Sequence, residues 1–149
     1  MITVDEKYYF LDTKSTSYVI RITPDGTVEQ CYYGKKIPSE QMDWYHQYLP
    51  YTLTVPMEIS EKTTTRDALP QECPSFGRGD FREPAVLLRG EDGRRVSELH
   101  FVRSVLHEGP VALQGLPYLD TVSGRVDTLQ LVLEDIVTGA EIWLFYTVF

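Results

Sequence analysis

Alternation of apolar and polar residues along most of the chain predicts β-strands rather than helices. Tyr18, Ile20 and Ile22 share one face of a first predicted strand. Residues 27–33 form the return strand after a Pro-Asp-Gly turn at residues 24–26. Proline sets φ for the first bend of such a turn, and glycine accepts the positive φ of the second. This spacing predicts an antiparallel hairpin.

Five other stretches carry a similar strand signal, and they cover residues 7–11, 84–89, 96–106, 127–134 and 140–149. Turn residues at 91–94 and 137–139 join the last four of these stretches into two further hairpins. No stretch keeps an i, i+3, i+4, i+7 apolar stripe for three turns, so we expect little helix. Closely spaced strands joined by such turns predict an all-β fold, an antiparallel β-sandwich.

The last predicted strand is apolar on both of its faces. One face carries aliphatic residues and Tyr146, whereas the other carries Trp143, Phe145 and Phe149. A sheet with one face in water should instead alternate apolar and polar residues. Two interpretations fit: a central strand inside a small sandwich, or a fragment of a longer sandwich whose remaining sequence covers one face. We favour the fragment, with residues 1–149 as one domain portion.

Residues 35–84 break the strand pattern, and five of the nine prolines precede Pro84 within this stretch. A long irregular stretch inside a compact domain is usually functional, interface-forming or disordered. Its part from residue 37 to residue 57 is rich in aromatic residues, which disordered segments avoid. We therefore expect an ordered excursion that packs on this domain or on a partner.

Asp43, Trp44 and Tyr45 are the candidate substrate-adjacent residues within this excursion. An aromatic ring can stack on the apolar face of a pyranose, while a carboxylate accepts hydrogen bonds from sugar hydroxyls. A solvated aspartate beside a packing tryptophan would give the same sequence, so both interpretations stay open.

The amino-acid composition of the chain argues against some classes of binding partner. The chain has 149 residues, 42% of them hydrophobic and 24% charged, as in an ordinary globular domain. Its formal net charge of −8 argues against nucleic acid or an anionic membrane surface as the main partner. No apolar run reaches the roughly 18–20 residues that span a bilayer, and the first residues lack a signal-peptide pattern. We therefore expect a cytoplasmic protein.

Candidate chemistry in the sequence is sparse. The three histidines and the two cysteines, Cys31 and Cys73, lack metal-ligand spacing, so we expect no metal and no cofactor. We interpret both cysteines as free thiols, with a disulfide as the open alternative. No nucleophile motif occurs, and we expect no catalytic residue in this chain.

The sequence Phe-Gly-Arg-Gly-Asp at residues 76–80 is superficially similar to a phosphate-binding loop. That fingerprint requires a preceding strand, a following helix and a third glycine. We instead expect a tight backbone crossing, because two glycines permit unusual dihedral angles. Asp80 and Arg82 would close this crossing by a carboxylate–guanidinium pair. The whole structural motif comprises Phe76, Gly77, Gly79, Asp80, Phe81, Arg82 and Pro84.

Residues 76–86, Phe-Gly-Arg-Gly-Asp-Phe-Arg-Glu-Pro-Ala-Val, resemble a motif in the N-terminal domain of bacterial α-galactosidases of glycoside hydrolase family 36. The likeness continues, in the order of the family, through residues 13–18, 32–36, 113–117 and 129–148. It therefore covers most of the chain and is more specific than any single motif.

This resemblance implies an N-terminal β-sandwich longer than this chain, followed by a (β/α)₈ barrel. The barrel would carry an aspartate nucleophile and an aspartate acid/base, and would hydrolyse terminal α-galactosides of the melibiose and raffinose type with retention. Both aspartates would lie beyond residue 149, so we expect the chain alone to be inactive.

The resemblance also implies partners for the chain. These are its own barrel domain, neighbouring subunits of a homo-oligomer such as a tetramer, and the α-galactoside substrate near the active-site entrance. The alternatives are a free-standing carbohydrate-binding module and an assembly domain without a role in sugar binding.

Overall fold

The computed structural model describes residues 1–38, 42, 57–59, 62–64, 66–117 and 124–149. Its strands are β1 (Ile2–Asp5), β2 (Tyr8–Asp12), β3 (Thr16–Ile22), β4 (Val28–Lys35), β5 (Met57–Ile59), β6 (Lys62–Thr64), β7 (Leu99–Glu108), β8 (Asp127–Asp135) and β9 (Glu141–Val148). The helical content of the described residues is one 3₁₀ turn, η2 (Arg66–Ala68).

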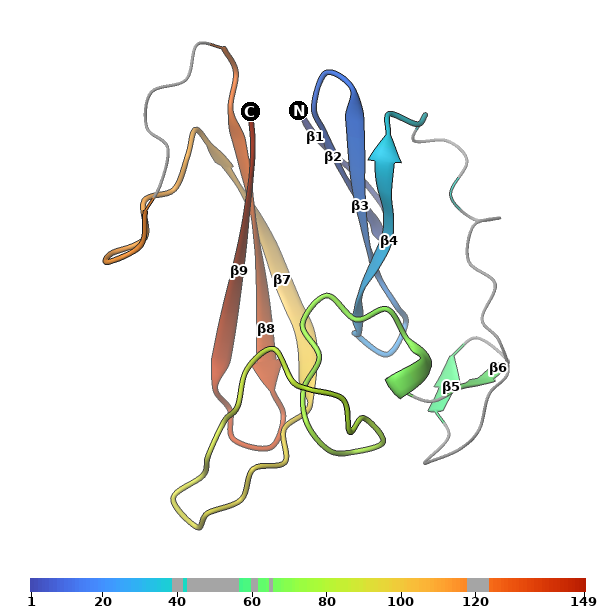
Figure 1. Ribbon diagram of the computed structural model, residues 1–149, viewed down its shortest axis with the longest axis vertical. Helices are drawn as coiled ribbons and strands as arrows, with labels where there is room; N and C mark the ends of the chain where they lie inside the picture. Colours follow the sequence, from blue (N-terminus) through green and yellow to red (C-terminus); the bar gives the residue numbers. More distant parts are fainter. Residues whose placement is uncertain (39–41, 43–56, 60–61, 65, 118–123) are drawn as a thin grey trace.

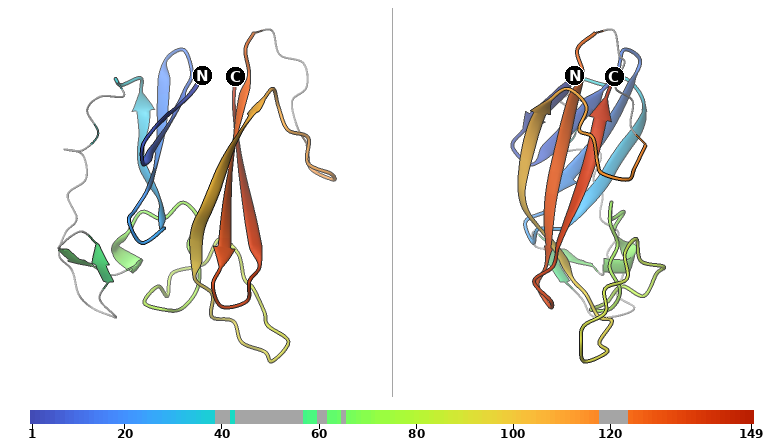
Figure 2. Two further views of the ribbon diagram at one scale, coloured as in Figure 1. Left: turned by 180° about the vertical axis from the view of Figure 1, so that it is seen from behind. Right: turned by 90° about the vertical axis from the view of Figure 1, so that its left-hand side faces the viewer.

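Two antiparallel sheets pack face to face (Figure 1). The first has the strand order β1-β2-β3-β4, the second has the order β7-β8-β9, and β5 pairs with β6 in a short separate hairpin. Seen from the side, the strands of one sheet lie over those of the other (Figure 2). This arrangement confirms the predicted all-β antiparallel sandwich.

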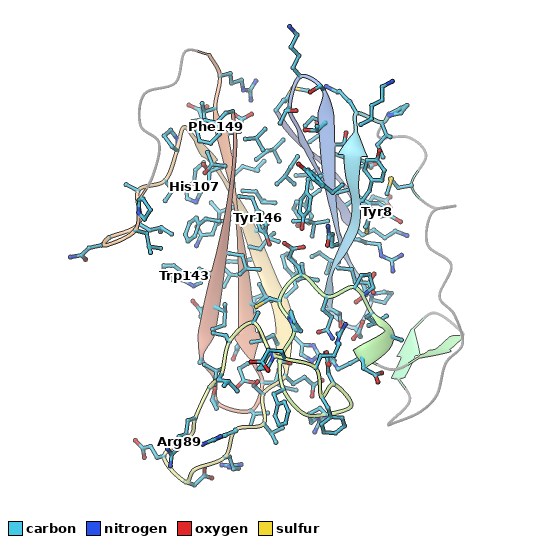
Figure 3. All side chains as sticks on the ribbon, in the orientation of Figure 1. Tyr8, Arg89, His107, Trp143, Tyr146 and Phe149 are labelled. Atoms are coloured by element: carbon cyan, nitrogen blue, oxygen red, sulfur yellow. The ribbon has the colours of Figure 1, made fainter. Side chains whose placement is uncertain are left out.

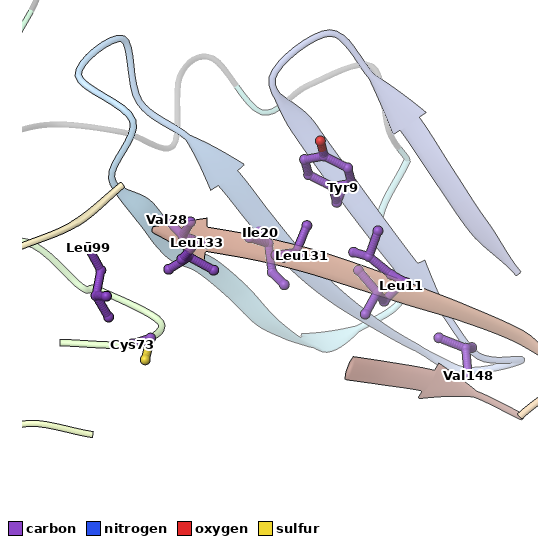
Figure 4. Close-up of a cluster of buried hydrophobic side chains, with 10 residues drawn as sticks. Tyr9, Leu11, Ile20, Val28, Cys73, Leu99, Leu131, Leu133 and Val148 are labelled. Carbon is purple, nitrogen blue, oxygen red and sulfur yellow. The ribbon is translucent and has the colours of Figure 1, made fainter. Parts of the chain in front are cut away.

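The core lies between the two sheets (Figure 4). Leu129, Leu131 and Leu133 of β8 are at most 2% exposed and meet the fully buried Ile20 of β3. Each leucine buried in this way stabilises the fold by roughly 1.5–3 kcal/mol. The prediction that Tyr18, Ile20 and Ile22 share one face is confirmed for β3, since Tyr18 and Ile22 pack partly buried against the cluster that contains Ile20.

Two of the three predicted hairpins are present. Strands β3 and β4 pair across a turn in which Gly26 has a φ of 84°. Strands β8 and β9 pair over their full length, with Asp127 opposite Val148. The aromatic-rich stretch at residues 7–11 corresponds to β2.

The hairpin predicted from residues 84–89 and 96–106 is wrong. A turn does form at residues 90–94, but no strand precedes it, and β7 pairs with β8 instead. The backbone nitrogen of Ala85 donates to the carbonyl oxygen of Pro74 at 2.9 Å, which ties this segment to the 74–86 loop rather than to β7.

Among the described strands, β9 pairs with β8 alone and forms an edge of the second sheet, which contradicts the interpretation as a central strand. Its residues Ile142, Leu144 and Tyr146 pack against the core, whereas Trp143 on the opposite face is 54% exposed.

The outer face of the first sheet is apolar and covered. Phe10, Val19 and Cys31 are at most 7% exposed and pack with Met42 and Ile37. Both covering residues belong to the excursion at residues 37–57, most of which lies outside the described residues. The described part therefore packs on this domain, as one of our two expectations had it.

Candidate functional site

The predicted site residues fall into two groups. Asp43, Trp44 and Tyr45 lie outside the described residues, so their contact with substrate stays a prediction. The motif at residues 76–84 lies in the loop between η2 and β7.

Residues 77–80 form a tight hairpin. The backbone nitrogen of Gly77 donates to the oxygen of Asp80 at 2.7 Å, and the reverse bond measures 3.2 Å. Arg78 and Gly79 between them have φ values of 55° and 93°, as a type I′ turn requires. Gly77 itself has a φ of 99°, and a Cβ there would lie 2.9 Å from Val96. The two glycines are therefore explained by backbone geometry rather than by phosphate binding.

Asp80 and Arg82 form the ion pair that we expected. The fully buried Asp80 carboxylate accepts hydrogen bonds from Arg82 Nε at 2.9 Å and Nη2 at 2.6 Å. Although burial acts to raise it, the bonds and charge of Arg82 hold the pKa of Asp80 below its ordinary value. The same guanidinium donates to the carbonyl oxygens of Leu69 and Arg66 at 2.9 Å and 3.0 Å. Arg82 thus fastens the hairpin to η2.

The backbone of residues 70–72 extends the edge of β4 through hydrogen bonds of 2.8 Å and 2.9 Å. The Gln71 amide nitrogen donates to Asp80 at 2.6 Å and to the carbonyl oxygen of Arg66 at 2.9 Å. An open edge strand would present unpaired N–H and C=O groups. These contacts cover part of one edge of the first sheet and attach the motif to it.

A second charged cluster centres on Glu98, directly before β7. Arg66 and His100 approach one carboxylate oxygen at 2.8 Å and 2.9 Å, and Arg78 approaches the other at 2.5 Å. Burial acts to raise the pKa of Glu98, but the His100 hydrogen bond and the Arg66 charge hold it below its ordinary value. The Glu98 amide donates to the Asp135 carboxylate at 2.7 Å. The cluster therefore joins η2 and the motif to the second sheet.

Glu72 connects the two sheets directly. Its carboxylate accepts a hydrogen bond from Tyr18 of β3 at 2.6 Å and another from Tyr146 of β9 at 2.8 Å. The two rings stack, with centroids 6.2 Å apart and planes 27° apart. Burial, together with the neighbouring carboxylate, raises the pKa of both phenols well above the ordinary value.

An open groove of about 480 Å³ lies beside the stacked tyrosines, at the end of the sandwich where both marked termini lie (Figure 1). Tyr18, Tyr33, Tyr146 and Phe149 contribute to its lining, and none of the described residues that line it carries a charged side chain. The described lining of the groove therefore offers ring faces and hydroxyls.

The two cysteine thiols are poorly suited to act as nucleophiles. Cys31 and Cys73 are both free and buried, as we interpreted them. Burial raises the pKa of the Cys31 thiol to about 12 and also raises that of Cys73, so neither is a ready nucleophile. Within the described ranges, no group of three His, Cys, Asp or Glu side chains could hold a metal ion. None of the helical segments described there is long and apolar enough to cross a membrane.

Residues 26–149 match the model of the glycosyl hydrolase family 36 N-terminal domain. The chain belongs to this family. The bifunctional alpha-galactosidase/sucrose kinase AgaSK of Mediterraneibacter gnavus is 33% identical over 97% of this chain. The alpha-galactosidase AgaA of Geobacillus stearothermophilus is 30% identical over 96% of it. The solved alpha-galactosidase from Lactobacillus brevis covers 99% of the chain at 28% identity, with a TM-score of 0.88.

The chain spans only a small part of these relatives. It covers 16% of AgaSK, 20% of AgaA and 20% of the Lactobacillus brevis structure. The family resemblance noted in the sequence is confirmed for the N-terminal domain.

The Glu72 bridge was not predictable from the sequence. Tyr18 and Tyr146 lie 54 and 74 positions from Glu72, so no local spacing brings them together. The one available signal was that Tyr146 shares a face of the last predicted strand with Ile142 and Leu144, and this does not say which face meets the core. The Arg66–Glu98 pair was missed for the same reason, since 32 positions separate its partners.

Proposed function

We propose that this chain is the non-catalytic N-terminal β-sandwich domain of a cytoplasmic α-galactosidase that takes part in carbohydrate metabolism. The observation that carries this proposal is the match of residues 26–149 to the N-terminal domain of the family. The charges of the domain support a scaffold role, because Asp80, Glu98 and Glu72 are all engaged by basic or phenolic partners.

The proposed parent enzyme hydrolyses terminal α-galactosides of the melibiose and raffinose type. Supporting this class, structures of AgaA variants are in complex with raffinose and with stachyose. The aspartate nucleophile and acid/base belong to the barrel that the resemblance implies, outside residues 1–149.

Turnover by the full-length protein tests this proposal. We expect it to hydrolyse 4-nitrophenyl α-galactoside and melibiose, and to leave 4-nitrophenyl β-galactoside intact as the control. A folded full-length protein that releases nitrophenol from neither anomer, or only from the β-anomer, would overturn the proposal.

We further propose that the domain supports a homo-oligomer and that Asp43, Trp44 and Tyr45 line the entrance to an active site. Contacts made equally to bound substrate and transition state raise KM without lowering kcat when they are removed. Asp43→Asn and Trp44→Ala in the full-length enzyme should therefore raise KM for raffinose more than they change kcat. Unchanged KM and kcat in both variants would contradict the entrance role, and full activity of the monomer would contradict the assembly role.

A further inference from the structure

We draw no further inference here: the strongest candidate, the ring-lined groove beside Tyr146 and Phe149 at one end of the sandwich (Figure 3), is an apolar surface, and nothing in the described residues shows what covers it.

Discussion

At the residue scale, two of the buried carboxylates in this domain lie beside an arginine. Asp80 is fully buried against Arg82, and Glu29 is fully buried 2.7 Å from Arg21. Removing one member of such a pair leaves an uncompensated charge, which costs more than the pair itself contributes. These arginines are therefore expected to tolerate replacement poorly.

Arg82→Lys should destabilise the domain by roughly 1–3 kcal/mol. This is less than the loss of a fully buried partner, because the Arg82 side chain is 39% exposed. An ammonium group cannot reproduce the forked contacts to Asp80 and to two carbonyl oxygens. Urea unfolding of the variant measures the loss. Arg94→Lys, which alters an exposed pair with Asp92, is the control and should leave the midpoint unchanged. Equal midpoints for both variants would contradict the role of Arg82.

Asp80→Asn should make the free energy of unfolding depend less steeply on pH in the acid range. The pKa of Asp80 is lowered in the folded state, so its contribution is complete above the ordinary pKa of about 3.9 and is lost as pH falls through the folded value. The asparagine variant lacks this titration. Its unfolding free energy should be lower near neutral pH and should decline less between about pH 5 and pH 2. A decline as steep as that of the parent chain would refute the expectation.

Gly77→Ala should cost more stability than Gly93→Ala. Both glycines have positive φ, 99° and 82°, so both variants suffer the left-handed penalty of about 1–2 kcal/mol. A Cβ at Gly77 would also lie 2.9 Å from Val96, whereas nothing lies within 4 Å of one at Gly93. Thermal unfolding compares the two variants, and adding Val96→Ala should recover part of the difference. Indistinguishable melting temperatures would show that the contact with Val96 does not matter.

At the element scale, the irregular segment at residues 66–82 acts as a brace between the sheets. It extends the edge of β4 through its backbone, and it reaches β3 and β9 through Glu72. Through Arg66 it also contacts Glu98 at the start of β7. The contact of Asp80 with Arg82 was predictable because Asp80 ends a turn that two glycines permit and Arg82 follows it by two positions.

The rest of this brace could not be read from the sequence. The stretch at residues 84–89 has strand-like alternation, yet its backbone bonds to Pro74 and not to a strand. Hydrogen bonds between Glu72 and the two tyrosines depend on how the sheets stack, which local alternation does not specify. The strands β3, β4, β8 and β9 were predictable because their periodicity and their glycine turns agree.

Tyr146→Phe should reduce the loss of stability at alkaline pH. The pKa values of Tyr18 and Tyr146 are raised in the folded state, so their contribution is complete below the ordinary value of about 10 and is lost as pH rises. Urea titrations between about pH 8 and pH 11 measure the slope. Tyr33→Phe, at a residue that is 69% exposed, is the control. If the free energy of unfolding of Tyr146→Phe fell with pH as steeply as that of the parent chain, the bridge through Glu72 would be contradicted.

At the scale of the whole molecule, the two sheets differ in how far their outer faces and edges are covered. The first has a covered outer face and an edge paired with residues 70–72, whereas the second presents Trp143 and an edge strand, β9. The two-sided apolar pattern of residues 140–149 is found in this edge strand of the second sheet.

The most direct test of the scaffold role is the initial rate at which the 149-residue chain, shown to be folded by circular dichroism, releases nitrophenol from 4-nitrophenyl α-galactoside. We predict a rate equal to that of buffer at every protein concentration, while the full-length protein turns over the same substrate. A rate that rises in proportion to the concentration of the 149-residue chain would contradict a non-catalytic domain.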